Sequence, residues 1–307
     1  MTAQLFPPAP TTTVRAPAKI NLHLGVGAAR PDGFHPLQTV YQAIGLYDDL
    51  TVSADDGWEV ALQVADYIEA AHVPLAGANI VDRAADLLAA HHGLVPRGVV
   101  AIAKEIPVAG GLAGGSADAA AALVALDRLW EVQTPDDELL ALAARLGSDV
   151  PFALVGGTAL GTGRGEVVTP VADRGTWWWV AVPSTEGLST PAVYRHFDEL
   201  FPDAPATPAP PAALLEALAT GDPLLLAATL HNDLEPAALD LRPDLESLIE
   251  RGEAAGALRG MVTGSGPTCV FLCESGDHAR DVAAALDESV VLVANGPVAG
   301  AHLVEYV

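Results

Sequence analysis

Residues 107–120 read PVAGGLAGGSADAA, and this stretch is the most informative part of the sequence. A short apolar run at 99–104 precedes it and an alanine- and leucine-rich run at 119–130 follows it, which predicts a strand, a loop and a helix. Glycine lets successive backbone N–H groups converge, and a helix start adds positive potential, so the arrangement favours a bound phosphate. Ser116 is expected to be the N-cap of the helix.

The glycine-rich loop is interpreted as a nucleotide-phosphate site spanning 110–116. It is not a P-loop, because Ser116 and Ala117 stand where a lysine and a hydroxyl residue are required. A glycine-rich turn needed only for close packing is the alternative.

Two other glycine segments resemble ligand loops less well. The segment 25–30, GVGAAR, has Arg30 in place of the third glycine of a dinucleotide fingerprint, and a Pro-Asp-Gly turn follows, which excludes a Rossmann domain. The segment 263–267, TGSGP, lies between two apolar runs. It is either a tight hairpin turn or a second glycine loop that faces the phosphates.

The remaining pattern predicts an α+β protein. Strands are expected at 20–26, 39–44, 50–52, 59–64 and 152–160, with helices at 79–92 and 136–146. The second of these helices stops at Gly147, so Asp149 lies just beyond a helix end. From residue 177 onward a strand, several helices, strands at 258–263, 268–273 and 290–293, and a helix at 277–286 indicate a second domain, with an exposed proline-rich insert at 201–211.

Composition limits the possible functions. The 307 residues are half apolar, enough for two domains or one large one, and carry a net charge of -24, which repels nucleic acid and anionic lipid. Neither a targeting peptide nor an apolar run of membrane-spanning length is evident, and Cys269 and Cys273 are expected as buried thiols. We expect a cytoplasmic protein that binds small molecules and holds phosphate through backbone groups.

Three segments together carry a resemblance to a known family: APAKINL at 16–22, the glycine-rich stretch at 107–120, and 261–271. Their order and spacing resemble the GHMP kinases. RPDGFHPL at 30–37, with LGSDVPF at 146–152 and NDLE at 232–235, is similar to the branch whose acceptor is a cytidine-diphosphate-linked methylerythritol. The resemblance covers nearly the whole chain.

The resemblance implies a two-domain fold with an active site between the domains. Residues 1–176 would form a domain like the second domain of ribosomal protein S5, and 177–307 a ferredoxin-like domain. The implied activity is ATP-dependent phosphorylation of the 2-hydroxyl of that acceptor, in isoprenoid precursor biosynthesis, by a monomer or weak homodimer. The alternatives are another small-molecule GHMP kinase, of the mevalonate or homoserine type, and a non-catalytic nucleotide-binding protein.

The resemblance also assigns the reacting centre to Lys19 and Asp149. Asp149 would orient the acceptor hydroxyl and take its proton, while Lys19 would keep the carboxylate ionised and stabilise charge on the phosphoryl oxygens. From the residues alone, a helix-end aspartate and a strand-edge lysine would be ordinary features.

For the nucleotide, the resemblance implies ATP with Mg²⁺, and the Ser116 hydroxyl is the expected metal ligand. The residues expected around ATP are Asn79, Lys104, Pro107, Ala109, Gly110, Gly111, Leu112, Ala113, Gly114, Gly115, Ser116 and Ala117. Asp118, where relatives often carry Asn, would repel the phosphates unless it holds Mg²⁺ or points away.

For the acceptor, the resemblance places the cytosine ring on Phe34, a position where relatives usually carry Tyr, and its edge on His35. A hydrophobic plug beside a turn is the alternative for this pair. The other residues expected around the acceptor are Asn21, at its methylerythritol end, and Thr190, Pro191 and Tyr194, on the far side of the base.

Overall fold

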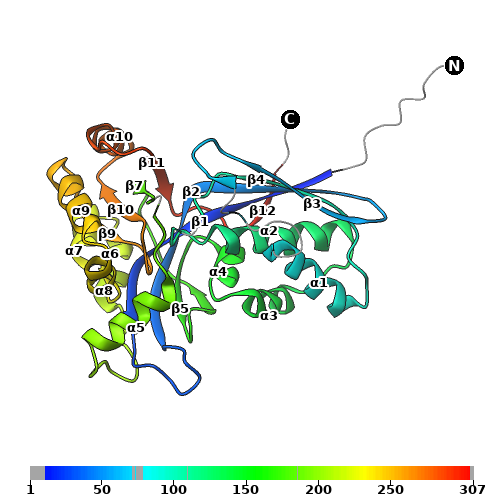
Figure 1. Cartoon of the computed structure of the whole chain (residues 1–307), viewed down its shortest axis with the longest axis horizontal. Coiled ribbons are helices and arrows are strands. Elements are labelled where there is room, and N and C mark those ends of the chain that lie inside the picture. Colours follow the sequence, from blue (N-terminus) through cyan, green and yellow to red (C-terminus); the bar gives the residue numbers. More distant parts are fainter. Residues whose placement is uncertain (1–10, 71–72, 74–78, 109, 185, 305–307) are drawn as a thin grey trace.

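The computed structural model describes residues 11–70, 73, 79–108, 110–184 and 186–304. These residues form two α+β halves that lie side by side (Figure 1). Among the described helices, none combines the length and the apolar composition of a transmembrane span.

The first half is built on an eight-stranded sheet. Its central path runs β12-β1-β2-β4-β3, while β5 adds to β2, β6 adds to β5, and β8 adds to β1. The strands are β1 (Thr11–Val26), β2 (Leu37–Ser53), β3 (Trp58–Val64), β4 (Gly98–Lys104), β5 (Thr158–Thr162), β6 (Val167–Pro170), β8 (His231–Asn232) and β12 (His302–Val304).

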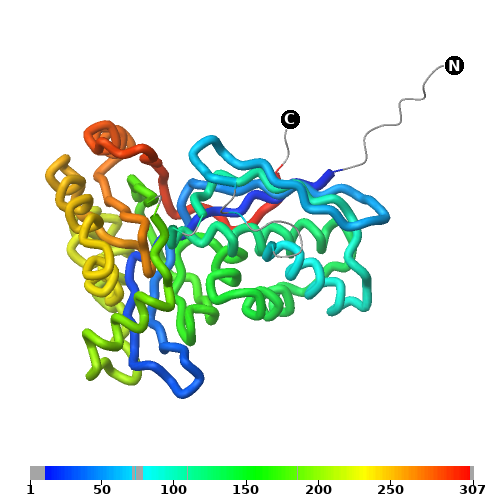
Figure 2. The backbone as a smooth tube through the Cα atoms, viewed as in Figure 1, coloured from blue at the N-terminus to red at the C-terminus, as the bar shows by residue number. Residues whose placement is uncertain are grey.

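The pair β1–β2 is longer than the sequence predicts. The separate strands expected at 39–44 and 50–52 are one strand, because antiparallel pairing continues between them, with Pro17 opposite Tyr47. Register shifts at Pro17/Ala18 and Asn21/His23 bend the pair without ending it. Figure 2 shows the result, a long blue hairpin that runs from the first half to the side of the second.

Four helices lie below the sheet in the view of Figure 1: α1 (Ile80–His92), α2 (Gly114–Leu129), α3 (Asp136–Leu146) and α4 (Val150–Val155). The central helix α2 is alanine-rich, and its alanines from Ala117 to Ala125 are fully buried. Small side chains let a helix approach its neighbours closely, so the start of α2 is fixed against β1 and β2.

The second half contains an antiparallel sheet of β7 (Trp177–Val182), β9 (Arg259–Val262), β10 (Cys269–Cys273) and β11 (Leu292–Gly296), in the order β11-β7-β10-β9. Helices come between β7 and β9 and between β10 and β11, which is the ferredoxin-like connection that was predicted. The helices are α5 (Thr190–Leu200), α6 (Ala212–Thr220), α7 (Pro223–Thr229), α8 (Glu235–Leu241), α9 (Asp244–Ala254) and α10 (Gly276–Ala285).

The boundary expected at 176/177 falls between β6 and β7, where the chain leaves the first sheet. The division itself stays a prediction, because β8 and β12 lie beyond it in the sequence and pair with β1. Both cysteines lie buried in β10, as predicted.

Two local predictions were wrong. The expected strand at 152–160 is instead the helix α4 followed by β5, because Pro151 fits the first turn of a helix and Gly156, at φ 66°, ends it. The proline-rich insert at 201–211 is mostly irregular, but it is not wholly exposed. Pro208 is buried, and the carbonyl of Pro205 accepts the N–H of Ala28 at 2.9 Å.

Candidate active site

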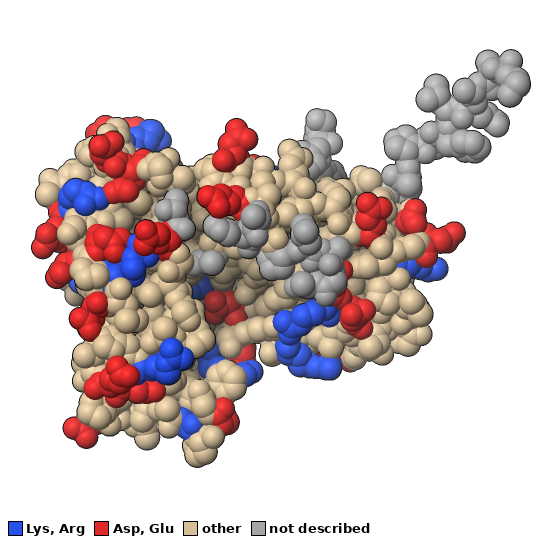
Figure 3. All heavy atoms as spheres, in the orientation of Figure 1, with Lys and Arg blue, Asp and Glu red and all other residues tan. Residues whose placement is uncertain are grey.

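A cavity of about 1030 Å³ lies where the two halves meet, and residues from both halves line it. The first half contributes β1, the glycine-rich loop and the turn before α4, while the second contributes α5 and the β9–β10 loop. Figure 3 shows a hollow in this face, between the two halves, with both basic and acidic atoms around it. The volume lies at the upper end of the usual range for a small-molecule site, which leaves room for a large ligand or for two substrates.

The glycine-rich loop is held from both sides. Its carbonyl at Leu112 accepts the N–H of Lys19 at 3.1 Å, and its carbonyl at Gly110 accepts the N–H of Thr268 at 3.2 Å. Gly111 has φ 84°, and a Cβ there would lie 2.7 Å from the carbonyl oxygen of Thr263, so only glycine fits. The protein thus engages these two carbonyls, and the loop can present N–H groups to an anion.

The start of α2 differs from the prediction. The helix begins at Gly114 with Ala113 as N-cap, so Ser116 is not the cap but lies in the first turn. A Cβ on Gly114 would lie 2.9 Å from Nζ of Lys104 and 3.1 Å from Cγ2 of Ile106, so glycine lets the first turn lie close to these two side chains. Ser116 still lines the cavity beside the positive end of the helix.

Below the loop, Lys104 forms a buried ion-pair cluster with Asp48 and Asp118. Its Nζ lies 2.9 Å from Oδ2 of Asp118 and donates a short hydrogen bond to Asp48. Asp48 also accepts the N–H groups of Glu105 and Ile106, at 2.7 and 2.8 Å, where the chain leaves β4. The repulsion expected from Asp118 is therefore offset, since its carboxylate pairs with an ammonium group.

Burial dominates the electrostatics of this cluster. Desolvation and then the charge of Asp118 raise the pKa of Asp48 to about 8. Burial alone would lower the pKa of Lys104, but the two carboxylates outweigh it and raise that pKa. Lys104 is thus a cation at neutral pH, held just under the glycine-rich loop.

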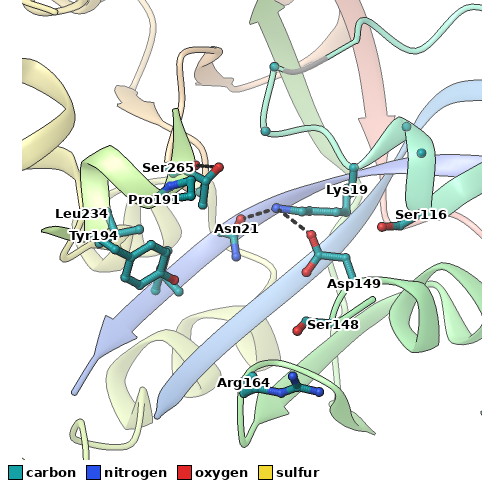
Figure 4. Close-up of a pocket in the computed structure, with 18 of the residues that line it drawn as sticks. Lys19, Asn21, Ser116, Ser148, Asp149, Arg164, Pro191, Tyr194, Leu234 and Ser265 are labelled. Carbon is teal, nitrogen blue, oxygen red and sulfur yellow. Dashed lines mark hydrogen bonds and ion pairs between the residues drawn. The ribbon is translucent and has the colours of Figure 1, made fainter. Parts of the chain in front are cut away.

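Lys19 and Asp149 meet at the centre of the cavity (Figure 4). The Nζ of Lys19 lies 3.7 Å from Oδ2 of Asp149 and donates a 2.7 Å hydrogen bond to Oδ1 of Asn21. Asn21 in turn donates to Thr39 Oγ1 at 2.8 Å, which fixes its amide. Lys19 is buried while Asp149 is partly open to the cavity, so the carboxylate can reach a ligand and the ammonium group stays oriented.

The predicted acceptor residues gather at the other end of the cavity. His35 Nε2 lies 2.9 Å from Oδ1 of Asp198, and its ring packs 4.8 Å from that of Tyr194. Phe34 is 47% exposed, and the guanidinium of Arg164 lies 4.6 Å from its ring centroid. This end therefore offers one open aromatic face beside an oriented imidazole.

Most predicted site residues line this one cavity. The structure brings together Lys19, Asn21, Phe34, His35, Asn79, Lys104, Pro107, Gly110, Gly111, Ala113, Gly114, Gly115, Ser116, Asp149, Thr190, Pro191 and Tyr194. The side chains of Leu112 and Ala117 are buried in the core and do not line the cavity, so contact of these two residues with ATP stays a prediction. Ala109 lies outside the described residues.

The segment 263–268 is the hairpin turn between β9 and β10, and its Gly264 and Ser265 line the cavity beside the first loop. Ser265 Oγ lies 2.8 Å from Thr190 Oγ1. The segment is therefore a hairpin turn, and it also lies beside the first glycine-rich loop. Its contact with phosphate stays a prediction.

Sequence reasoning missed several lining residues, including Tyr41, Ser148, Arg164, Arg195 and Asp198. For Arg164 a signal was present, since GTGRG at 161–165 is a further glycine-rich turn. Ser148 lies in the turn before α4, and Tyr41, Arg195 and Asp198 belong to a strand and a helix whose pattern gives only their secondary structure.

Comparisons with known proteins give the family. The GHMP kinases N terminal domain matches residues 79–157, and the GHMP kinases C terminal domain matches 214–292. A 4-diphosphocytidyl-2-C-methyl-D-erythritol kinase of Nocardioides sp. is 73% identical over 296 residues, which cover 95% of this chain and 100% of the relative. The chain belongs to the 4-diphosphocytidyl-2-C-methyl-D-erythritol kinases.

Further relatives agree with this family. The kinase of that name from Thermobifida fusca is 53% identical over 311 residues, covering 96% of this chain and 99% of the relative. A crystal structure of a 4-(cytidine 5'-diphospho)-2C-methyl-D-erythritol kinase has a TM-score of 0.75 at 34% sequence identity. The match covers 92% of this chain and 98% of the chain in that structure. A homoserine kinase from Cytophaga hutchinsonii shares the fold, with a TM-score of 0.73 at 17% sequence identity. The match covers 99% of this chain and 100% of that kinase. The two-domain GHMP kinase fold predicted from the sequence is thus confirmed.

Proposed function

We propose that this protein transfers the terminal phosphoryl group of ATP to the 2-hydroxyl of 4-diphosphocytidyl-2-C-methyl-D-erythritol, in the methylerythritol phosphate pathway of the cytoplasm. The observation that carries the proposal is the Lys19–Asp149 pair, which lies in a cavity bordered by the glycine-rich loop and by the Phe34–His35 segment. One end of the cavity suits a triphosphate and the other suits a base.

The reacting centre supports in-line transfer. Asp149 accepts the proton of the acceptor hydroxyl, which makes the oxygen a better nucleophile toward the γ-phosphorus. Lys19 lies within 3.7 Å of that carboxylate and offsets the negative charge of the transferring group. The Asn21 amide holds the ammonium group in place through its 2.7 Å hydrogen bond.

The nucleotide end suits an anion despite the net charge of -24. The loop N–H groups and the α2 dipole would bind the phosphates, and the Lys104 ammonium group beneath them offsets the negative charge of Asp118. Mg²⁺ fits this site as an ion that enters with ATP: Ser116 supplies a hydroxyl oxygen, and the described residues form no cluster of three His, Cys, Asp or Glu side chains for a metal. When bound, Mg²⁺ would neutralise phosphate oxygens.

The acceptor end suits cytosine in particular. A carboxylate only accepts hydrogen bonds, so His35 Nε2 donates to Asp198, and in that tautomer Nδ1 is an acceptor. An Nδ1 acceptor matches the exocyclic amine of cytosine, which is a donor. Uracil has a carbonyl at that position and would be rejected.

Replacing Phe34 by alanine should weaken acceptor binding by about 1 to 3 kcal/mol, the usual loss when a base loses its stacking partner. The affinity for ATP should stay unchanged, because Phe34 lies at the opposite end of the cavity from the glycine-rich loop. Isothermal titration with each ligand measures both values. The exposed Phe201, outside the cavity, provides the matched control Phe201→Ala, and equal losses for both ligands would contradict the assignment.

A single assay tests the proposed function. Purified protein is given ATP and Mg²⁺ with the cytidine compound, its uridine analogue, mevalonate or homoserine, and ADP release is measured. We expect turnover of the cytidine compound alone. Turnover of mevalonate or homoserine with an inert cytidine compound would identify another small-molecule GHMP kinase, and ATP binding without any turnover would identify a non-catalytic protein.

A further inference from the structure

Tyr41 contacts the carboxylate at the centre of the cavity. Its phenol donates a 3.1 Å hydrogen bond to Oδ1 of Asp149, while Oδ2 of the same carboxylate faces Lys19 at 3.7 Å. The ring of Tyr41 lies 5.7 Å from the Lys19 ammonium and borders the cavity. The Asp149 carboxylate is thus held at both oxygens, one by the phenol and one by the ammonium.

The surroundings of Tyr41 leave its ring little freedom. The side chain is 2% exposed, and its ring packs 4.9 Å from that of Phe152, in the helix that begins just after Asp149. A Cβ on Gly165 would lie 2.2 Å from the phenol oxygen, and one on Gly161 would lie 2.6 Å from the ring. Two glycines of the β5–β6 hairpin therefore make room for a hydroxyl-bearing ring that points at Asp149.

Toward Asp149 the phenol acts as a hydrogen-bond donor. Burial and then the charge of Asp149 raise the pKa of Tyr41 well above its ordinary value. A group that keeps its proton throughout the physiological range cannot compete with Asp149 as a base. It can only fix where the carboxylate points.

We infer that Tyr41 is a positioning residue for phosphoryl transfer, which holds the Asp149 carboxylate so that Oδ2 stays beside Lys19 and faces the acceptor hydroxyl. The inference rests on the role proposed above for Asp149. A tyrosine needed only to fill the core would not require its hydroxyl, because phenylalanine occupies nearly the same space. Here the hydroxyl reaches a carboxylate that is 31% exposed to the cavity.

Positioning matters for this chemistry because proton transfer needs the base within hydrogen-bond reach of the hydroxyl. Without the phenol, Asp149 can rotate about its side-chain bonds and spend less time in the productive geometry. Substrate binding does not depend on that rotation, since the glycine-rich loop and the Phe34–His35 segment remain in place.

The test is Tyr41→Phe in the full chain. We expect kcat to fall about 10- to 100-fold, as for losing a hydrogen bond to a charged group, while KM for ATP and for the acceptor changes less than about twofold. Tyr47→Phe, on the same strand but outside the cavity, is the matched control and should keep full activity. Thermal unfolding of both variants checks that the fold is intact.

A double-mutant cycle separates positioning from general damage. In an Asp149→Asn background, adding Tyr41→Phe should cause no further loss in kcat, because the carboxylate to be positioned is absent. A full additional loss would overturn the inference, as would unchanged kcat in the single variant or equal changes in kcat and KM. If the unaltered protein itself fails to phosphorylate the cytidine compound, the proposed function fails instead, so the two failures are distinguishable.

Discussion

Replacing Asp149 by asparagine should lower kcat by about 10² to 10⁴-fold, the usual contribution of a positioned general base. The amide keeps the size of the carboxylate and can still contact Lys19 and Tyr41, but it cannot accept the hydroxyl proton. ATP affinity should be nearly unchanged, since the glycine-rich loop is held by Lys19 and Thr268 backbone groups that the substitution leaves alone. Steady-state kinetics and ATP titration measure the two effects.

A matched control is Asp136→Asn, at the exposed start of α3 and outside the cavity, which should keep normal kcat. Full activity of Asp149→Asn would remove this carboxylate from the reaction. A parallel loss of ATP binding would show instead that the substitution disturbs the site as a whole.

Replacing Lys104 by methionine should lower the free energy of unfolding by about 3 to 5 kcal/mol, because it leaves the buried side chains of Asp48 and Asp118 without the cation that both of them contact. ATP binding should weaken as well, since the cation lies directly beneath Gly114 and the chain around Glu105 and Ile106 is tied to Asp48. Urea unfolding followed by circular dichroism measures the change in stability.

The loss of stability in Lys104→Met should depend on pH. Because the pKa of Asp48 is raised to about 8, by burial first and Asp118 second, the folded state keeps a proton that the unfolded state releases above pH 4. The unaltered protein therefore loses stability as pH rises from about 4 to 8. Lys104→Met should lose stability more steeply over the same range, because the Lys104 ammonium group is absent. A loss in Lys104→Met that is independent of pH would contradict this account.

An exposed pair gives the control for Lys104. Arg280 and Asp277 form an ion pair at the surface of α10, and such pairs contribute little. Arg280→Met should thus leave the free energy of unfolding almost unchanged at every pH. If both variants lose equally, burial is not the cause.

Local chemistry made part of the site predictable. The order of strand, glycine-rich loop and helix follows from neighbouring residues, and the structure has it at β4, 110–113 and α2. The meeting of Lys19 with Asp149 is different, since it depends on how β1 and α4 pack. Only the family resemblance pointed to that pair before the structure placed the two side chains 3.7 Å apart.

The misses also have physical causes. Ser116 is a good N-cap by residue type, yet the N-cap is Ala113, three residues earlier, and glycine at 114 lets the first turn pass close to Lys104. Asp118 looked harmful beside phosphates, since its partner Lys104 lies on another element and its carboxylate turns toward that lysine. Tyr41 fits the pattern of a buried strand, and nothing in that pattern says where its hydroxyl points.

The pairing of β12 with β1 affects how the chain can fold during synthesis. Thr13, Val14 and Arg15 form their outer backbone pairs with residues 302–304. While a ribosome is still making the second half, this stretch of β1 presents an uncovered strand edge, which is a place where nascent chains can associate wrongly. The first half of the protein therefore completes its sheet only after nearly all of the second half has been translated.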